Sequence, residues 1–230
     1  MNWSSKTFYE SKLEAHESVQ SRLLCQLPVV KANENTEVPL VLIDTTGCDM
    51  YEMATEDDQS RANEGEAALV TVYAQELIEA GIDPAEIAII TPYNLQVELI
   101  RLQLKDKYPS LEIRSVDGFQ GREKEVVILS LVRSNISKEI GFLAEPRRLN
   151  VAITRAKRHV ALIANVETVS SDATLKGLME YCEASGQVRS AMQYQHLVEA
   201  VDMLRPEGLE LTLKVSLESR VTLLWNRLSS

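Results

Sequence analysis

Two arginines in the second half of the chain have a spacing that could serve phosphate chemistry. Arg148 and Arg155 are seven residues apart in a segment, 146–156, that has a helical pattern, so we expect them to project from nearly the same face. The opposite side is small and apolar, with Leu149, Ala152, Ile153 and Ala156. Two guanidinium groups along one face suit a phosphate, because each offers planar donors that are always charged. A solvated basic face is the simpler interpretation, but the apolar remainder of the helix favours a cleft.

A polar turn at 117–121, between two apolar runs, is a second candidate. A connecting turn uses glycine for its backbone geometry and needs no other special residue. Here Gln120 and Glu123 are also present, and both could bond to a sugar hydroxyl or order a water molecule. The pattern fits a plain connection as well, so both interpretations stay open.

The segment Thr91-Pro92-Tyr93, with Gln96 soon after it, follows another apolar run. Tyr93 could stack on a nucleobase or cap the core, and the sequence favours neither. Asn63, with Glu66 three residues later, is typical of a helix cap rather than of a binding site.

Strands and helices must alternate to position these segments. Apolar runs predict strands at 38–43, 87–90, 111–116, 126–132 and 159–164, and helical patterns begin near 63 and cover 95–102, 146–156 and 175–184. Strands that are apolar throughout indicate a parallel sheet with helices on both faces, which is an α/β fold. Ligands of such sheets bind beyond the carboxyl ends of the strands. We therefore expect all three candidate segments to meet at that edge.

Composition and charge exclude several classes of protein. The 230 residues are 45% hydrophobic and carry a net charge of −10, so a phosphate-bearing partner must be held in a local groove rather than by the overall field. The acidic residues cluster at Glu52, Glu56, Asp57 and Asp58, and the basic ones at Arg147, Arg148, Arg155, Lys157, Arg158 and His159. Three scattered cysteines predict neither a disulfide framework nor a metal site. No run approaches the roughly 20 apolar residues of a membrane span, and no secretory signal is present. We expect an intracellular protein, cytoplasmic or nuclear, that does not bind membranes.

The chain divides into three parts. Residues 1–35 are expected to be a lead-in segment from a truncated upstream region, because they show neither a cap nor a clear first strand. Residues 36–186 form one α/β domain, and 187–230 form an extension of unknown role. Within that extension, 209–225 alternates like an exposed strand or a poorly packed tail.

Three motifs together resemble the second RecA-like motor domain of superfamily 1 helicases. The segment 115–123, SVDGFQGRE, matches the fifth motif of that family, 147–156, RRLNVAITRA, its sixth, and 91–96, TPYNLQ, a motif between the fourth and fifth. Within the superfamily, the chain is similar to the group that contains the nonsense-mediated-decay helicase and immunoglobulin mu-binding protein 2, up to about Tyr194. The resemblance implies a RecA-like parallel sheet with helices on both faces, the P-loop NTPase-type fold of a second motor domain.

The resemblance also implies a mechanism and a set of roles. In this family two RecA-like domains clamp ATP and Mg²⁺ and move toward the 3′ end of single-stranded RNA or DNA. The first domain holds the phosphates and Mg²⁺, and the second supplies arginines. By resemblance, Arg155 is the arginine finger and Arg148 supports it. The nucleotide side is lined by Gln120, Gly121 and Glu123, with Glu123 at the ribose. The nucleic-acid strand is faced by Thr91, Tyr93, Gln96, Ser115 and Asp117.

One departure from the family limits what this chain does alone. It contains no G-x-x-x-x-G-K-[ST] loop and no Gly-Lys dipeptide, so it cannot cradle a nucleoside triphosphate by itself. We therefore expect a helicase motor domain that is inactive without the first RecA-like domain of the same parent protein. The alternative is a non-catalytic RecA-like module that binds nucleic acid or a protein partner. A nuclease is disfavoured, because no acidic metal-ligand cluster lies on a predicted sheet edge.

Overall fold

A single parallel sheet organises the computed structural model, which describes residues 2–54, 60–119 and 121–203. Six strands pair in the order β5-β4-β6-β7-β1-β8, and every pair is parallel. These strands are β1 (Leu40–Asp44), β4 (Ile87–Thr91), β5 (Glu112–Ser115), β6 (Lys124–Ser130), β7 (Ala156–Ala164) and β8 (Gln187–Ser190). A separate antiparallel pair is formed by β2 (Met53–Ala54) and β3 (Arg61–Ala62).

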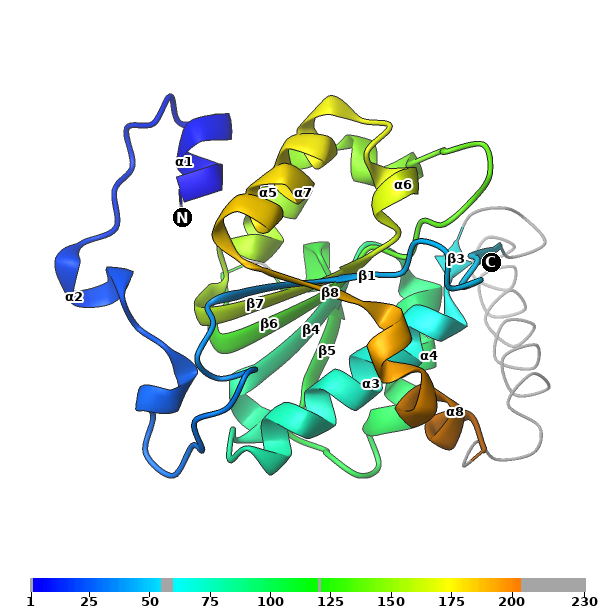
Figure 1. Ribbon diagram of the computed structural model, residues 1–230, viewed down its shortest axis with the longest axis horizontal. Helices are drawn as coiled ribbons and strands as arrows, with labels where there is room; N and C mark the ends of the chain where they lie inside the picture. The colour runs from blue at the N-terminus through cyan, green and yellow to red at the C-terminus, as the bar shows by residue number, and fades with distance from the viewer. Residues whose placement is uncertain (1, 55–59, 120, 204–230) are drawn as a thin grey trace, which may run out of the picture.

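Helices cover both faces of the sheet (Figure 1). The helices are α1 (Asn2–Phe8), α2 (Glu17–Gln20), α3 (Glu64–Glu79), α4 (Asn94–Leu104), α5 (Pro146–Ile153), α6 (Val166–Val169), α7 (Ala173–Ser185) and α8 (Gln195–Met203). Short 3₁₀ turns are η1 (Leu24–Gln26), η2 (Pro84–Glu86), η3 (Asp117–Phe119), η4 (Gly141–Ala144) and η5 (Ala191–Tyr194). The predicted α/β fold, with a parallel sheet covered on both faces, is confirmed.

Alternate residues of each buried strand enter two separate cores. In β1, Val41 and Ile43 join the core under α3 and α4, whereas Leu42 joins the core under α5 and α7. The same alternation in β4 and β6 explains why these strands are apolar along most of their length, since each side chain meets a helix on one face or the other.

Helix α3 is the central buried helix of one layer. It begins as predicted, because the side chain of Asn63 accepts a hydrogen bond from the backbone N–H of Glu66 at 2.9 Å. It ends before Gly81, whose φ of +106° favours glycine and where a Cβ would lie 2.5 Å from the Val29 carbonyl oxygen. Asn63 and Gly81 therefore fix the two ends of the helix.

A buried polar pair joins α3 to the sheet. The Nδ1 atom of His159 lies 2.7 Å from the Val38 carbonyl oxygen, so it must carry the proton and donate. The Nε2 atom then accepts from the Tyr73 hydroxyl at 3.0 Å. Burial lowers the pKa of His159 to about 4. His159 is thus a neutral core residue rather than part of a basic surface.

Some sequence-based expectations differ from the structure. Strand β8 and helix α8 lie beyond residue 186, yet β8 pairs with β1 and α8 packs on α3. Leu102, the last residue of the predicted helix 95–102, is 45% exposed. The predicted alternating segment 209–225 lies outside the described residues. The domain limits themselves stay a prediction. No helix in the described ranges is long and apolar enough to cross a membrane.

Candidate functional site at two edges of the sheet

The sequence predicted that all candidate residues meet at one edge of the sheet. In the structure they lie at two opposite edges. Glu123 directly precedes Lys124, the first residue of β6, and Arg155 directly precedes Ala156, the first residue of β7. Thr91 and Ser115, in contrast, are the last residues of β4 and β5. The strands are parallel, so these two groups lie at opposite ends of them. We call these ends the amino edge and the carboxyl edge.

At the amino edge, the two motifs are brought together by the start of the sheet itself. The backbone N–H of Lys124 donates to the carbonyl oxygen of Arg155 at 3.1 Å, and Lys124 pairs with Ala156 across the two strands. Glu123 and Arg155 are therefore neighbours across β6 and β7. This backbone contact links the two predicted nucleotide-side segments.

Arg155 lies beyond the helix that was expected to carry it. Helix α5 ends at Ile153. The Thr154 backbone N–H still donates to the Asn150 carbonyl oxygen at 3.1 Å, but the Arg155 backbone N–H donates to Ala152 at 3.2 Å, and the Val151 carbonyl accepts from the Thr154 hydroxyl at 3.1 Å instead. The Arg155 Nε atom then donates to the Val151 carbonyl oxygen at 3.1 Å, and Nη2 donates to the Thr154 hydroxyl at 3.2 Å. The expected common helix face with Arg148 is therefore wrong.

The Arg155 guanidinium keeps donors to spare. Its Nη1 group and one Nη2 hydrogen have no partner among the described residues, and no described carboxylate lies within 4.0 Å of it. The side chain is half-buried and held at two points. A positive charge that is positioned but not neutralised is suited to an anionic ligand.

The loop that enters β6 is open to solvent. Gly121 has a φ of +77°, and nothing lies within 4 Å of the position a Cβ would take. The glycine is therefore required by backbone conformation rather than by a close approach. Glu123 is exposed, and Gln120 lies outside the described residues.

Arg148 lies toward the carboxyl edge rather than beside Arg155. Its Nε atom lies 3.6 Å from Asp117, which follows β5, and 3.2 Å from Glu145. The side chains of all three are substantially exposed. Arg148 is thus a paired surface arginine, whereas Arg155 is without an acidic partner in the described structure.

The predicted strand-facing residues of the segment 91–96 are buried. Thr91 and Gln96 have no exposed surface, and Tyr93 is 3% exposed. Gln96 accepts from the Asn63 backbone N–H at 2.8 Å and donates to the Asn63 carbonyl and to the Ser130 hydroxyl. A side chain enclosed and bonded in this way cannot contact a strand, so the prediction for Gln96 is wrong. Ser115 is half-buried and Asp117 is exposed, so these two remain accessible.

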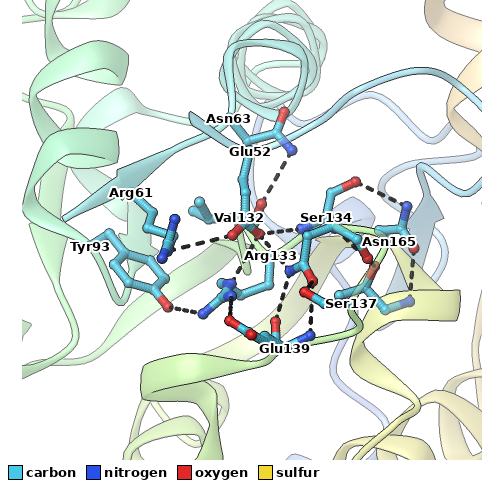
Figure 2. Close-up of polar contacts among 12 residues, drawn as sticks. Glu52, Arg61, Asn63, Tyr93, Val132, Arg133, Ser134, Ser137, Glu139 and Asn165 are labelled. Atoms are coloured by element: carbon cyan, nitrogen blue, oxygen red, sulfur yellow. Dashed lines mark hydrogen bonds and ion pairs between the residues drawn. The ribbon is translucent and has the colours of Figure 1, made fainter. Parts of the chain in front are cut away.

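A buried ion pair closes the carboxyl edge (Figure 2). The Glu52 carboxylate accepts from Arg133 Nε at 2.9 Å, from the Ser134 backbone N–H at 2.7 Å and from Asn135 Nδ2 at 3.1 Å. Arg61 Nε lies 3.5 Å away. The side chains of Arg133 and Glu52 are only 4% and 7% exposed. The side chain of Glu52, which the sequence placed in an acidic cluster, is therefore enclosed by the protein.

The same arginine joins further segments that follow strand ends. Arg133 Nη1 donates to the Tyr93 hydroxyl at 3.3 Å. A Cβ on Gly141 would overlap that Nη1 atom and lie 2.9 Å from the Tyr93 oxygen, so only glycine fits there. Asn165, after β7, donates to the Ser134 hydroxyl at 3.1 Å. The ends of β4, β6 and β7 are thus held together by side-chain bonds, as Figure 2 shows.

Glu66 lies beneath this network without any exposed surface. One carboxyl oxygen accepts from the Ser130 hydroxyl at 2.6 Å and from the Val132 backbone N–H at 2.9 Å, and the other has no partner in the described structure. Burial raises the pKa of Glu66 to about 7, against the effect of those two bonds. Val132 has a φ of +72°, an uncommon conformation for a β-branched residue, and the bond to Glu66 holds it.

Sequence reasoning missed Glu52, Glu66 and Arg133 as one cluster. One sequence feature could have pointed to Arg133, since this charged residue directly follows the apolar run 126–132. Glu66 was recognised only through its backbone, as a partner of the Asn63 cap. Nothing in the spacing pairs residue 52 with residue 133, since residue 52 precedes β2, outside the six-stranded sheet, and residue 133 follows β6.

Comparisons with known proteins identify the family of this chain. A family model described as an AAA domain matches residues 1–167. The DNA-binding protein SMUBP-2 of Rattus norvegicus is 55% identical over 192 residues, 84% of this chain and 19% of the relative. The DNA polymerase alpha-associated DNA helicase A of Schizosaccharomyces pombe is 49% identical, over 72% of this chain and 26% of the relative. A Regulator of nonsense transcripts 1 homolog of Neurospora crassa is 38% identical, over 70% and 15%.

The parallel sheet with helices on both faces is a RecA-like α/β fold. The chain belongs to the AAA-domain family of superfamily 1 helicases, the family of SMUBP-2 and of the regulators of nonsense transcripts. It spans about a fifth of the length of the SMUBP-2 relative.

Proposed function

We propose that this chain is the second motor domain of an ATP-dependent helicase that moves toward the 3′ end of single-stranded RNA or DNA. Its role is to supply Arg155 to the ATP held by the first RecA-like domain of the same parent protein. One observation supports this proposal most directly. The Arg155 side chain is held by hydrogen bonds to Val151 and Thr154, yet it has no acidic partner among the described residues.

The residues at the amino edge fit a bound nucleotide. A guanidinium beside the γ-phosphate stabilises the negative charge that develops during phosphoryl transfer. Gly121 and Glu123 belong to the same edge, and we propose that they line the nucleotide together with Gln120, with Glu123 at the ribose hydroxyls. No group of three or more His, Cys, Asp or Glu side chains in the described ranges could hold a metal ion, and we assign Mg²⁺ to the first domain. A supporting role for Arg148 requires it to leave its ion pairs with Asp117 and Glu145, because it lies toward the carboxyl edge.

The accessible strand contacts on this chain are Ser115 and Asp117, at the end of β5. Thr91 and Tyr93 act on the strand through the shape of the carboxyl edge, because both are buried. The chain alone hydrolyses no ATP above background, since it has no phosphate loop.

The test is Arg155→Ala in the full-length parent protein. We expect the ATP hydrolysis rate to fall at least about a hundredfold, because arginine fingers contribute on the order of 10³–10⁵ and Arg148 remains. Arg155→Lys restores little, because an ammonium lacks the planar fork. Affinity for a labelled single strand without nucleotide stays nearly unchanged. Normal hydrolysis with loss of the strand would place Arg155 on the wrong side of the domain and favour a non-catalytic binding module.

A further inference from the structure

Strand β5 is an outer strand of the sheet, and one of its faces carries charge. In the strand order, β5 has a neighbour only on the side of β4. Ile113 is buried in the core under α3 and α4. Glu112 and Arg114 alternate with it and so project from the opposite face.

Glu112 is shared by three cations. Its carboxylate forms an ion pair with Arg122 Nη1, and it lies 3.6 Å from Lys124 Nζ and 3.8 Å from Arg114 Nε. One carboxylate cannot neutralise three cations, so the cluster keeps a net positive charge in a chain whose net charge is −10. The positive charge faces solvent, because the side chains of Arg114 and Arg122 are 48% and 55% exposed. The side chain of Glu112 is only 12% exposed.

The neighbouring acids do not cancel this charge. Asp117 is engaged with Arg148 at 3.6 Å. Within the described residues, Glu112 is the only carboxylate within 4.0 Å of Arg114 or Arg122. The Arg114 side chain lies alongside Gly118, 3.9 Å from the position of a Cβ there, which places it beside the loop that carries Ser115 and Asp117.

We propose that Arg114 and Arg122 form a phosphate-binding ridge for the single strand, continuing the surface of Ser115 and Asp117. The proposal rests on the proposed function for the identity of the ligand. Guanidinium groups match phosphodiester oxygens with two parallel donors, and phosphate contacts position a strand without reading its bases. The ridge therefore holds RNA and DNA without regard to base sequence. Glu112 organises the ridge, because it fixes both arginines from below.

The experiment measures strand affinity of the full-length parent protein against salt concentration, without nucleotide, for labelled oligouridylate and oligothymidylate. The slope of log affinity against log salt becomes shallower by about 0.7 for each phosphate of a single strand that the protein no longer neutralises. Arg114→Ala/Arg122→Ala should flatten the slope by roughly 1 to 1.5 and weaken binding about tenfold near 0.1 M salt. The doubly substituted Arg114→Lys/Arg122→Lys protein should keep the slope, because an ammonium also neutralises a phosphate.

The matched control is Lys176→Ala on α7. Its side chain is 60% exposed and paired with Glu180 at 3.9 Å, so it removes one surface charge away from the ridge and should leave the slope unchanged. Unchanged thermal unfolding shows that all variants are folded, as expected for exposed side chains. A slope that stays at the wild-type value in the double alanine variant overturns the ridge. So does a loss of ATP turnover at saturating strand with unchanged strand affinity, which would assign Arg122 to the nucleotide side, between Gly121 and Glu123.

The experiments can disprove the ridge and the arginine finger separately. Strand binding is measured without nucleotide and does not depend on Arg155. If Arg155→Ala keeps normal hydrolysis while the ridge variants lose the strand, the finger falls and the ridge stands. If Arg155→Ala abolishes hydrolysis and the ridge slope is unchanged, the reverse holds.

Discussion

The two edges of the sheet use arginine in opposite ways. At the carboxyl edge, Arg133 is buried and bonded to Glu52 and Tyr93, so its charge is neutralised inside the protein. At the amino edge, Arg155 is held by a carbonyl and a hydroxyl, and no carboxylate in the described part of the chain neutralises its charge. Both arginines follow or precede apolar strands in the sequence. What separates them is whether the fold brings a carboxylate to them.

This difference explains why a parallel sheet alone does not locate the site. The general rule places ligands beyond the carboxyl ends of strands, and here that edge is sealed near β4, β6 and β7. The accessible chemistry lies at the amino edge and at the outer strand β5. If the proposed function holds, a second motor domain that acts on a nucleotide held by another domain needs no ligand pocket of its own, only exposed groups on rigid supports.

The largest expected change in the free energy of unfolding comes from a substitution at the carboxyl edge. Arg133→Met leaves the Glu52 carboxylate buried without its main partner and should lower the free energy of unfolding by about 3–5 kcal/mol. Urea unfolding of this chain measures it. The control is Arg148→Met, whose ion pairs are at the surface and which should cost less than about 1 kcal/mol. Equal losses in the two variants would contradict the comparison of the edges.

The second prediction concerns Glu66 and pH. The folded carboxyl has a pKa of about 7 against 4.5 for the unbonded group. Its contribution is fully present below pH 4.5, where both states are protonated, and is lost as the pH rises through 7, because the unfolded state ionises first. His159 acts in the opposite direction, since its pKa is lowered from 6.5 to about 4.

The difference between wild type and Glu66→Gln isolates the carboxyl from His159. We expect the wild-type free energy of unfolding, relative to that of Glu66→Gln, to fall by a few kcal/mol between pH 4.5 and about 7. Urea titrations at a series of pH values measure it. Parallel pH profiles for the two proteins would show that the buried carboxyl does not titrate in this range.

The third prediction tests the revised role of Gln96. Gln96→Ala removes a partner from the Asn63 backbone N–H, at the start of α3, and from the Ser130 hydroxyl, at the end of β6, and should cost about 2 kcal/mol. Gln193→Ala, at an exposed position, should cost almost nothing. Strand affinity of the folded full-length protein should be unchanged in both. A strand-binding loss with unchanged stability would restore Gln96 to the strand-facing set.

Local features of the fold could be predicted from the sequence because their causes are local. The continuously apolar runs at β4 and β6 predicted strands buried on both faces, and Asn63 with Glu66 predicted the start of α3. The end of α5 could not be found in this way. The pattern continued to Ala156, but the Thr154 hydroxyl competes for the last carbonyls, and the pairing of Lys124 with Ala156 draws the chain into β7.

The candidate site was predictable only in part, because contacts between distant segments depend on strand order. Arg155 and Glu123 were singled out as residues that the core does not need, and the structure leaves both with polar groups to spare. The burial of Glu52 and Gln96 was not foreseen, since their partners Arg133, Asn63 and Ser130 are more than thirty residues away. Polar residues near strand ends satisfy one another as readily as they bind ligands, and composition does not distinguish the two.

The smallest change in stability is expected at Glu123, which tests the amino edge in the comparison of the two edges. Glu123 is exposed and has no hydrogen bond or ion pair to another described residue, so Glu123→Ala should alter the free energy of unfolding by less than about 0.5 kcal/mol. If its carboxylate accepts from a ribose hydroxyl, losing that charged hydrogen bond should weaken ATP binding or turnover in the full-length parent about tenfold. Steady-state hydrolysis, with the Michaelis constant and the maximal rate determined separately, measures the effect.

Glu125→Ala is the control two residues along, where the side chain is paired with Arg158 and Lys157, and hydrolysis should not change. An unfolded Glu123→Ala protein would assign the residue to the turn itself, and unchanged kinetics would remove Glu123 from the nucleotide side while leaving Arg155 in place.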